Sequence, residues 1–450
     1  MPYRDYWDDK PPGLYLIDAA SQAGFPWLDR WLVCWLLTVV LTVVAAVILE
    51  SLLRPRIGGV MAFGAALVST FFVACYPTAL GGGYGESFAL PFVLAALWML
   101  SRSGGRMREV ALTGLFLGAA CLLSLQALPA TVAIGLATAY RRSIPESVGR
   151  GIALALGAAA LPALVFGWLV WGGAGAQAYD VLVRYNSEFY RANGQLLFWA
   201  RLLLAVIFVS ALLPSMVAEV VSWLRRRNGV DRVAAACGAW ILLSLASFIY
   251  GQRVYMHYLI LVVPAMIVIA APAFVRVSAR LQSPAAAPRR IAIAAQGSAV
   301  AMLLVAAFWG AQWPGTGAAI TTDWHRDQVA VSSWIRANTP ASATLFVWGD
   351  HPEIYLSSDR SPVCPYIYMD PMVTEGYWSQ QSTEDLLASW QSNPPSFVVD
   401  APAAVPLFRG GVSPADEQRL YDVLSPLRAF VRDHYRLVHT DGQADVWARN

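Results

Sequence analysis

The sequence contains almost no lysine. Of its 32 basic residues, 31 are arginine, and the one lysine is Lys10. A net charge of only +3 in 450 residues gives no case for a nucleic-acid partner. Lys10 follows two carboxylates, Asp8 and Asp9, and precedes a stiff Pro11-Pro12 turn. A single ammonium in this setting is therefore a candidate functional group rather than part of a surface patch that serves only solubility.

Charge and cysteine are also scarce. Only 14% of the residues are charged and 57% are hydrophobic, with a mean hydropathy of +0.50, which excludes a single water-soluble domain and predicts an integral membrane protein. Of the five cysteines only Cys364 lies in the polar C-terminal part, so neither a disulfide framework nor a Cys/His metal cluster is expected. The first 26 residues do not have the pattern of a cleavable signal peptide, and we expect the first membrane helix to direct targeting.

Long apolar runs predict an α-helical polytopic membrane protein with about ten spans. The runs begin near Trp31, Val60, Ser87, Val110, Leu128, Ile152, Leu196, Val233, His257 and Ile291. Sixteen arginines gather in alternate turns between them, at positions 54, 56, 102, 106, 108, 141, 142, 150, 225, 226, 227, 232, 276, 280, 289 and 290. By the positive-inside rule these turns are cytoplasmic. The N-terminus, residues 172–194 and everything after Gly310 are then extracytoplasmic.

The C-terminal part changes character after the last span. Short β-rich runs at 344–348 and 396–400 alternate with helical stretches at 323–338 and 416–431. This pattern is typical of a small α/β domain. We therefore expect an extracytoplasmic loop at 1–28, a transmembrane domain at 29–310 and an extracytoplasmic α/β domain at 311–450.

Two polar clusters lie near the predicted outer ends of the first spans. In the first, Asp5, Asp8 and Asp9 are carboxylates suited to base catalysis or to a divalent cation, and Lys10 is suited to a phosphate. The alternative is a solvated interfacial loop. The second cluster is Gly81–Glu86, where glycines permit close approach to a ligand, or simply form a hairpin turn.

Two more clusters lie in later outer turns. Arg253 and His257 are four residues apart, so a helix would place both on one face; Arg and Tyr as membrane anchors are the alternative. Residues 179–191 interleave Tyr with Arg, Asn and Glu. Such a mixture suits sugar-like or phosphate groups, but an amphipathic helix on the membrane is the favoured interpretation. The sequence shows no Ser-His-Asp set, nucleotide-binding glycine loop or zinc signature. ATP-driven transport therefore has no support.

The N-terminal segment contains the motif Pro2-Tyr3-Arg4-Asp5-Tyr6-Trp7-Asp8-Asp9-Lys10-Pro11-Pro12-Gly13-Leu14-Tyr15. This motif resembles the first extracytoplasmic loop of the GT-C glycosyltransferases related to protein mannosyltransferases and the lipid A aminoarabinose transferase. The turn with Tyr84 and Glu86, and the His257-Tyr258 pair followed by Pro264, resemble later positions of that family. The resemblance runs over the whole membrane part and into the α/β domain.

The resemblance implies a membrane glycosyltransferase that moves a sugar, with inversion, from a polyprenyl-phosphate donor to an extracytoplasmic glycan, lipid or protein. It implies that Lys10, with Arg253 or His257, holds the donor phosphate, and that Tyr84, Glu86 and Tyr258 contact substrate. Asp5, Asp8 and Asp9 then include the acid-base function, with Asp9 beside the phosphate or at a divalent metal. These roles agree with the chemistry of the reaction, because a phosphate leaving group requires positive charge beside it and an acceptor hydroxyl requires a nearby base.

The sequence departs from the family pattern in two places. Family members carry a first membrane helix and an acidic motif before this segment, whereas here Met1 directly precedes Pro2. We expect a start downstream of the true one; a truncated, inactive lipid-carrier binding protein or transporter is the alternative. At Ser124-Leu125-Gln126, relatives often show Lys-Pro before the Gln, and this difference weakens any claim for a second lysine contact.

Overall fold

The structure is a computed structural model. It describes residues 1–28, 30–74, 84–102, 106–140, 142–191, 195–210, 212–225, 231–251, 255–281, 330–349, 351–374, 377, 379–401, 405–408, 414–441 and 444–450. The chain forms two compact units. Unit 1 comprises residues 1–9, 169–193 and 307–450, and unit 2 comprises residues 10–168 and 194–306.

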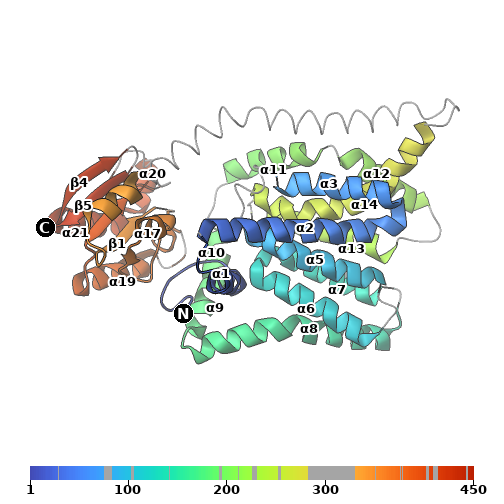
Figure 1. Ribbon diagram of the computed structural model, residues 1–450, viewed down its shortest axis with the longest axis horizontal. Coiled ribbons are helices and arrows are strands. Elements are labelled where there is room, and N and C mark those ends of the chain that lie inside the picture. The colour runs from blue at the N-terminus through green and yellow to red at the C-terminus, as the bar shows by residue number, and fades with distance from the viewer. Residues whose placement is uncertain are drawn as a thin grey trace. The chain divides into compact units, whose positions relative to one another are not determined.

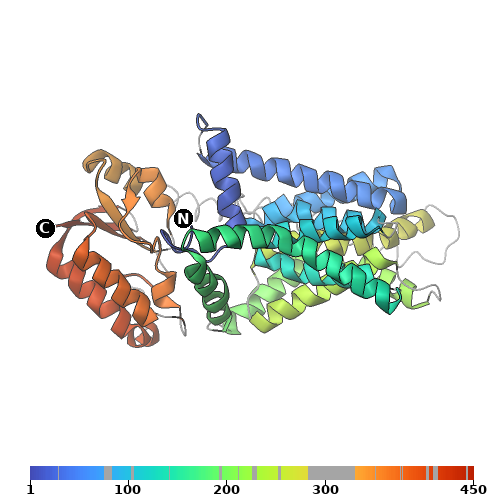
Figure 2. The ribbon, with the colours of Figure 1, turned by 90° about the horizontal axis from the view of Figure 1, so that it is seen from below.

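Unit 2 is a bundle of apolar helices that run side by side in Figures 1 and 2. Its helices are α1 (Pro12–Gly24), α2 (Arg30–Ile57), α3 (Gly59–Ala74), α5 (Gly85–Arg102), α6 (Met107–Leu123), η1 (Leu125–Ala127), α7 (Leu128–Ala139), α8 (Ile144–Trp171, which ends in unit 1), α11 (Gln195–Val209), α12 (Leu213–Arg225), α13 (Arg232–Gly251), η3 (Met256–Tyr258) and α14 (Leu259–Leu281). Nine of the ten predicted spans coincide with these helices, and the tenth, near Ile291, lies outside the described residues. The predicted polytopic fold is confirmed.

Burial separates central from peripheral helices of the bundle. The apolar window of α14 is 78% buried, whereas that of α2 is 17% buried and that of α8 only 11%. Exposed valines such as Val43 and Val47 lie along α2. Such side chains suit contact with lipid tails, which are as apolar as the protein interior. Four helices of the described part are long and apolar enough to cross a membrane, and others are shorter.

Small residues bring α6 and α8 into backbone contact. A Cβ on Gly114 would lie 2.1 Å from the Leu154 carbonyl oxygen, and one on Gly118 would lie 2.2 Å from that of Ala158. On the facing helix, a Cβ on Gly157 would lie 2.0 Å from the Ala111 carbonyl oxygen. Glycine at this spacing permits close helix packing where no hydrophobic effect drives association.

The arginine-rich turns come together at one end of the bundle. Arg56, at the end of α2, binds Asp231 at the start of α13 at 3.0 Å. Arg232 is within electrostatic range of Arg142 and Arg150. Three turns that the charge pattern assigns to one side therefore meet in space, as a polytopic topology requires.

Unit 1 contains a five-stranded sheet with the order β2-β1-β3-β5-β4. Its elements are α9 (Gly175–Tyr179), the π-helix η2 (Asp180–Tyr185), α10 (Asn186–Arg191), β1 (Thr344–Trp348), α17 (Glu353–Ser358), β2 (Ser361–Pro362), α18 (Asp370–Val373), α19 (Ser379–Ser392), β3 (Phe397–Asp400), α20 (Pro414–Arg419), α21 (Tyr421–His434), β4 (Tyr435–Asp441) and β5 (Ala444–Arg449). The strands β2, β1 and β3 are parallel, and β5 is antiparallel to both β3 and β4. Both β-runs expected from the sequence form strands of this sheet.

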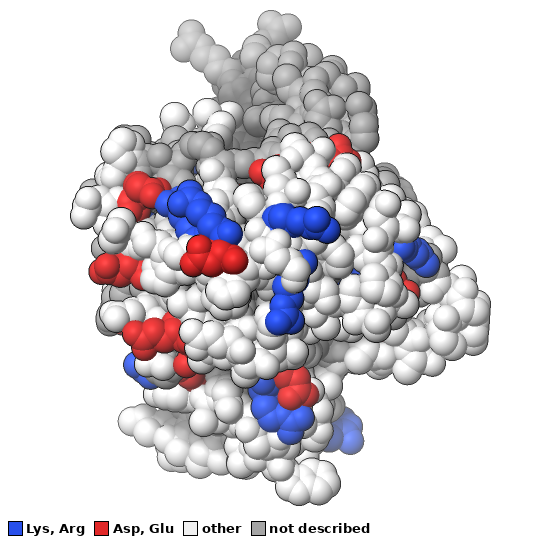
Figure 3. Space-filling view, turned by 90° about the vertical axis from the view of Figure 1, so that its left-hand side faces the viewer, with Lys and Arg blue, Asp and Glu red and all other residues white. Residues whose placement is uncertain are grey.

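Helices cover both faces of the sheet, because side chains alternate along its strands. Phe346 and Trp348 pack in one core with Trp390 of α19 and the apolar side of α21. Leu345 and Val347 pack in a second core with a helix through residues 330–338 and with α17. Figure 3 looks onto this unit and shows acidic and basic side chains mixed over its surface.

Candidate functional site

A buried carboxylate marks the end of unit 2 opposite the arginine-rich turns. Glu86 lies in the first turn of α5 and is only 7% exposed. Its Oε1 accepts a hydrogen bond of 2.9 Å from the hydroxyl of Ser124, the C-cap residue that directly follows α6. The Ser124 Oγ also accepts from the Gln126 backbone N–H at 3.2 Å. The hydroxyl is thereby held with its proton toward Glu86.

Two glycines let neighbouring helices approach this turn closely. A Cβ on Gly85 would lie 2.3 Å from the Leu123 carbonyl oxygen. A Cβ on Gly13 would lie 2.5 Å from the Leu122 carbonyl oxygen, so the start of α1 rests directly on the end of α6. Both distances are below those that real Cβ atoms show. The sequence therefore needs glycine at both places to bring α1, and Lys10 just before it, to the head of α5.

Lys10 is exposed and lies within electrostatic range of both Glu86 and His257. The His257 ring stacks on Tyr84, with centroids 4.4 Å apart and planes at 7°. Tyr258 meets the same ring edge-on at 4.8 Å. Five residues that the sequence singles out are thus gathered at one place, which we call the Lys10 site (Lys10, Tyr84, Glu86, His257 and Tyr258). They lie just before α1, at the start of α5 and in η3.

The three predicted acidic residues belong to unit 1. Arg4 donates to Asp5 at 2.7 and 3.0 Å and the terminal amine donates at 2.6 Å, and these bonds hold the pKa of Asp5 well below its usual range. Asp8 accepts from the Tyr368 hydroxyl at 3.0 Å, and the Asp9 N–H donates to the same oxygen at 3.4 Å. Asp5 is therefore engaged in local ion pairs, while Asp8 and Asp9 are anchored to the C-terminal domain.

Two predicted contacts remain expectations. Arg253 lies outside the described residues, as do the glycines at 81–83. Among the residues that the structure describes, no group of three His, Cys, Asp or Glu side chains is placed to hold a metal ion. A role of Asp9 as metal ligand stays a prediction.

Sequence reasoning missed three residues at or beside the Lys10 site. Ser124 carries no charge and was noticed only as a departure from Lys-Pro. Tyr255 stacks on His257 with centroids 5.4 Å apart, and Arg201 places its guanidinium 5.1 Å from the Tyr255 ring centre. An arginine inside an apolar run such as 195–209 is costly in a membrane and is in itself a signal of function.

Solved structures share this architecture. ArnT from Cupriavidus metallidurans bound to undecaprenyl phosphate is 13% identical with a TM-score of 0.55, over 99% of this chain and 89% of that one. The apo state of the same protein gives 14% identity and a TM-score of 0.53, over 99% and 88%. A third structure is archaeal oligosaccharyltransferase AglB from Archaeoglobus fulgidus, in complex with an inhibitory peptide and a dolichol-phosphate. It is 13% identical with a TM-score of 0.51, over 100% of this chain and 67% of that one.

The likeness defines the class of fold. The chain shares the fold of these proteins, a polytopic helical bundle followed by a domain with a sheet. By sequence, no family model matches it, and no curated protein matches it either. At such low identity the similarity establishes the fold, and the activity must be argued from the site.

Proposed function

We propose that this chain is a membrane glycosyltransferase that moves a sugar from a polyprenyl-phosphate donor to an extracytoplasmic acceptor. Support comes from the fold, which is shared with two proteins whose structures contain undecaprenyl phosphate and dolichol-phosphate. The sugar itself is left open by the site, and the acceptor is a glycan, lipid or protein.

The observation that carries this proposal is the convergence at the Lys10 site. The only lysine of the chain lies within range of His257 and of a buried carboxylate, at the bundle end opposite the arginine-rich turns. When a sugar leaves a lipid phosphate, negative charge grows on the phosphate oxygens, and a positioned cation stabilises it. Glu86 lies within electrostatic range of the Lys10 ammonium, and the Tyr84 ring stacks on His257.

In the proposed reaction the acceptor hydroxyl attacks the anomeric carbon, and the bond from that carbon to the phosphate oxygen breaks. The electron pair of that bond stays on the lipid phosphate, next to Lys10. The hydroxyl proton passes to a carboxylate, for which Asp8 and Asp9 are the candidates because they precede Lys10 directly in the chain. A single displacement inverts the configuration at the sugar carbon.

The test uses the protein in nanodiscs with a series of radiolabelled sugars on polyprenyl phosphate. We expect Lys10→Ala to abolish donor binding and sugar transfer. The matched control is Arg108→Ala, which removes an exposed cation from the start of α6, at the opposite end of the bundle. Unchanged donor binding by Lys10→Ala would refute the role of Lys10. If the unchanged protein binds the donor but transfers no sugar, the result would favour a lipid-carrier binding protein instead.

A further inference from the structure

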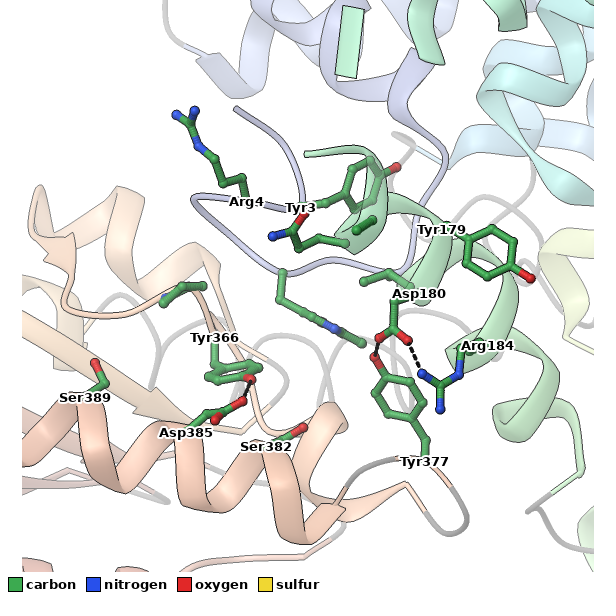
Figure 4. A pocket seen from close by; sticks show the side chains of 15 residues that line it. Tyr3, Arg4, Tyr179, Asp180, Arg184, Tyr366, Tyr377, Ser382, Asp385 and Ser389 are labelled. Atoms are coloured by element: carbon green, nitrogen blue, oxygen red, sulfur yellow. Dashed lines mark hydrogen bonds and ion pairs between the residues drawn. The ribbon is translucent and has the colours of Figure 1, made fainter. Parts of the chain in front are cut away.

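Unit 1 contains a cavity of about 720 Å³ that the proposed donor chemistry does not use. Three stretches that are far apart in the sequence form its wall: the N-terminal segment with Tyr3 and Trp7, the helical segment 176–184 of α9 and η2, and residues 365–389 of the C-terminal domain. Figure 4 shows their side chains around the opening. The volume lies in the range of small-molecule sites.

The cavity wall is held in place by contacts within unit 1. Asp180 starts the π-helix η2, a rare conformation that is frequent at functional sites. Its carboxylate accepts from the Tyr377 hydroxyl at 2.5 Å and from Arg184 at 2.9 Å (Figure 4). The Trp7 ring meets Tyr185 edge-on at 4.6 Å, and the backbone N–H of Trp7 donates to the Pro365 carbonyl at 2.7 Å. The site is thus preformed from segments that would be far apart without the fold.

The lining combines aromatic rings with hydrogen-bonding groups of both kinds. Tyr179 and Tyr366 contribute rings, and Asp385, Ser382 and Gln177 contribute acceptors and donors. Burial and the nearby Asp385 raise the pKa of Tyr366 to about 12, so its phenol remains a hydrogen-bond donor at neutral pH.

Charge in the cavity is balanced. The two cations of its lining are Arg4, which pairs with Asp5, and Arg184, which pairs with Asp180. An anionic ligand such as a phosphate would need an excess of positive charge, and none is present in the lining. A ligand with apolar faces and many hydroxyls, without net charge, fits these walls best.

We propose that this cavity binds neutral pyranose rings of a glycan, as a carbohydrate site separate from the Lys10 site. The tyrosine rings pack on the C–H faces of the sugar, while Asp385, Gln177 and Ser382 bond its hydroxyls. A peptide is the competing ligand, but extended peptides bind through a row of backbone hydrogen bonds to a strand edge. The cavity is walled mainly by helices and loops.

The experiment measures saturation-transfer NMR of maltose, cellobiose and mannobiose with the full chain in nanodiscs, which avoid sugar-based detergents. We expect at least one disaccharide to bind, and Tyr179→Ala and Asp385→Ala each to weaken it at least tenfold. The matched controls are Tyr421→Ala and Asp433→Ala, which remove exposed side chains of α21 outside the cavity and should leave binding unchanged. Tyr179 and Tyr421 are 59% and 60% exposed, so neither change disturbs a core.

The result separates this proposal from the proposed function. Lys10→Ala should leave disaccharide binding unchanged, and Tyr179→Ala should leave binding of polyprenyl phosphate unchanged. The carbohydrate site is overturned if no disaccharide binds, if binding survives both cavity substitutions, or if only an unglycosylated peptide binds. Absence of sugar transfer would contradict the proposed function alone.

Discussion

The substitution Gly13→Ala tests whether the approach of α1 to α6 positions Lys10. The added methyl would lie 2.5 Å from the Leu122 carbonyl oxygen and 2.9 Å from its carbon, where ordinary contacts are 3.4–4 Å. The obstacle is backbone, so α1 has to move away by about 1 Å, an overpacking that costs about 1–3 kcal/mol. Lys10 is three residues before this contact and moves with it.

A displacement of about 1 Å at a catalytic group lowers activity by about 100-fold. We therefore expect kcat/KM for sugar transfer to fall by about two orders of magnitude in Gly13→Ala. The control is Gly24→Ala at the other end of α1, where a Cβ meets nothing within 4 Å. Transfer by Gly13→Ala at a rate close to that of the unchanged protein would refute the reasoning, provided that the thermal unfolding midpoint shows a folded bundle.

Four further outcomes are expected. Gly118→Ala should lower the unfolding midpoint because the added methyl meets the α8 backbone. The control Gly151→Ala, whose methyl meets nothing within 4 Å, should leave the midpoint unchanged. Equal midpoints for the two variants would contradict the packing argument. Ser124→Ala should lower the free energy of unfolding by about 1–3 kcal/mol, since the buried Glu86 carboxylate loses a donor. Ser101→Ala, whose hydroxyl donates to the Trp98 carbonyl of its own helix, should lower it less. The pKa of Tyr366 rises from 10.0 to about 12 on folding, so the folded state holds this phenol proton more tightly than the unfolded state does. The resulting stabilisation of the folded state is complete below pH 10 and is lost as the pH rises toward 12. Tyr366→Phe should therefore reduce the fall of the unfolding midpoint between pH 10 and pH 12. A periplasmic reporter fused to the C-terminus should be active, and an inactive one would reverse the proposed orientation.

The local parts of the fold could be predicted from the sequence. Hydropathy found nine of the spans in the bundle, though not α1 or α12, because a membrane span needs about 20 apolar residues in a row. The runs at 344–348 and 396–400 became β1 and β3 because β-branched and aromatic residues favour strands. Lys10, Glu86 and His257 were singled out by charge and by resemblance, and the structure brings them together; their roles stay predictions.

The non-local parts of the site could not be read in this way. Ser124 matters only because the end of α6 meets the head of α5, a contact between residues 38 positions apart. The wall of the cavity joins Asp180 to Tyr377, which are 197 positions apart. Hydrophobic periodicity describes one helix or strand at a time and carries no information on such pairs.

The sequence by itself determined a polytopic membrane protein, the alternation of its charged turns and the choice of its single lysine as a candidate site residue, because each follows from composition or from a short run of residues. Only the tertiary structure decided which side chains surround that lysine, and that Tyr179 and Asp180 line a cavity. The physical reason is that the glycines at 13 and 85 let two other segments approach the backbone at the end of α6 more closely than any side chain would allow. Such contacts depend on the whole packing of the bundle, and no single segment encodes them.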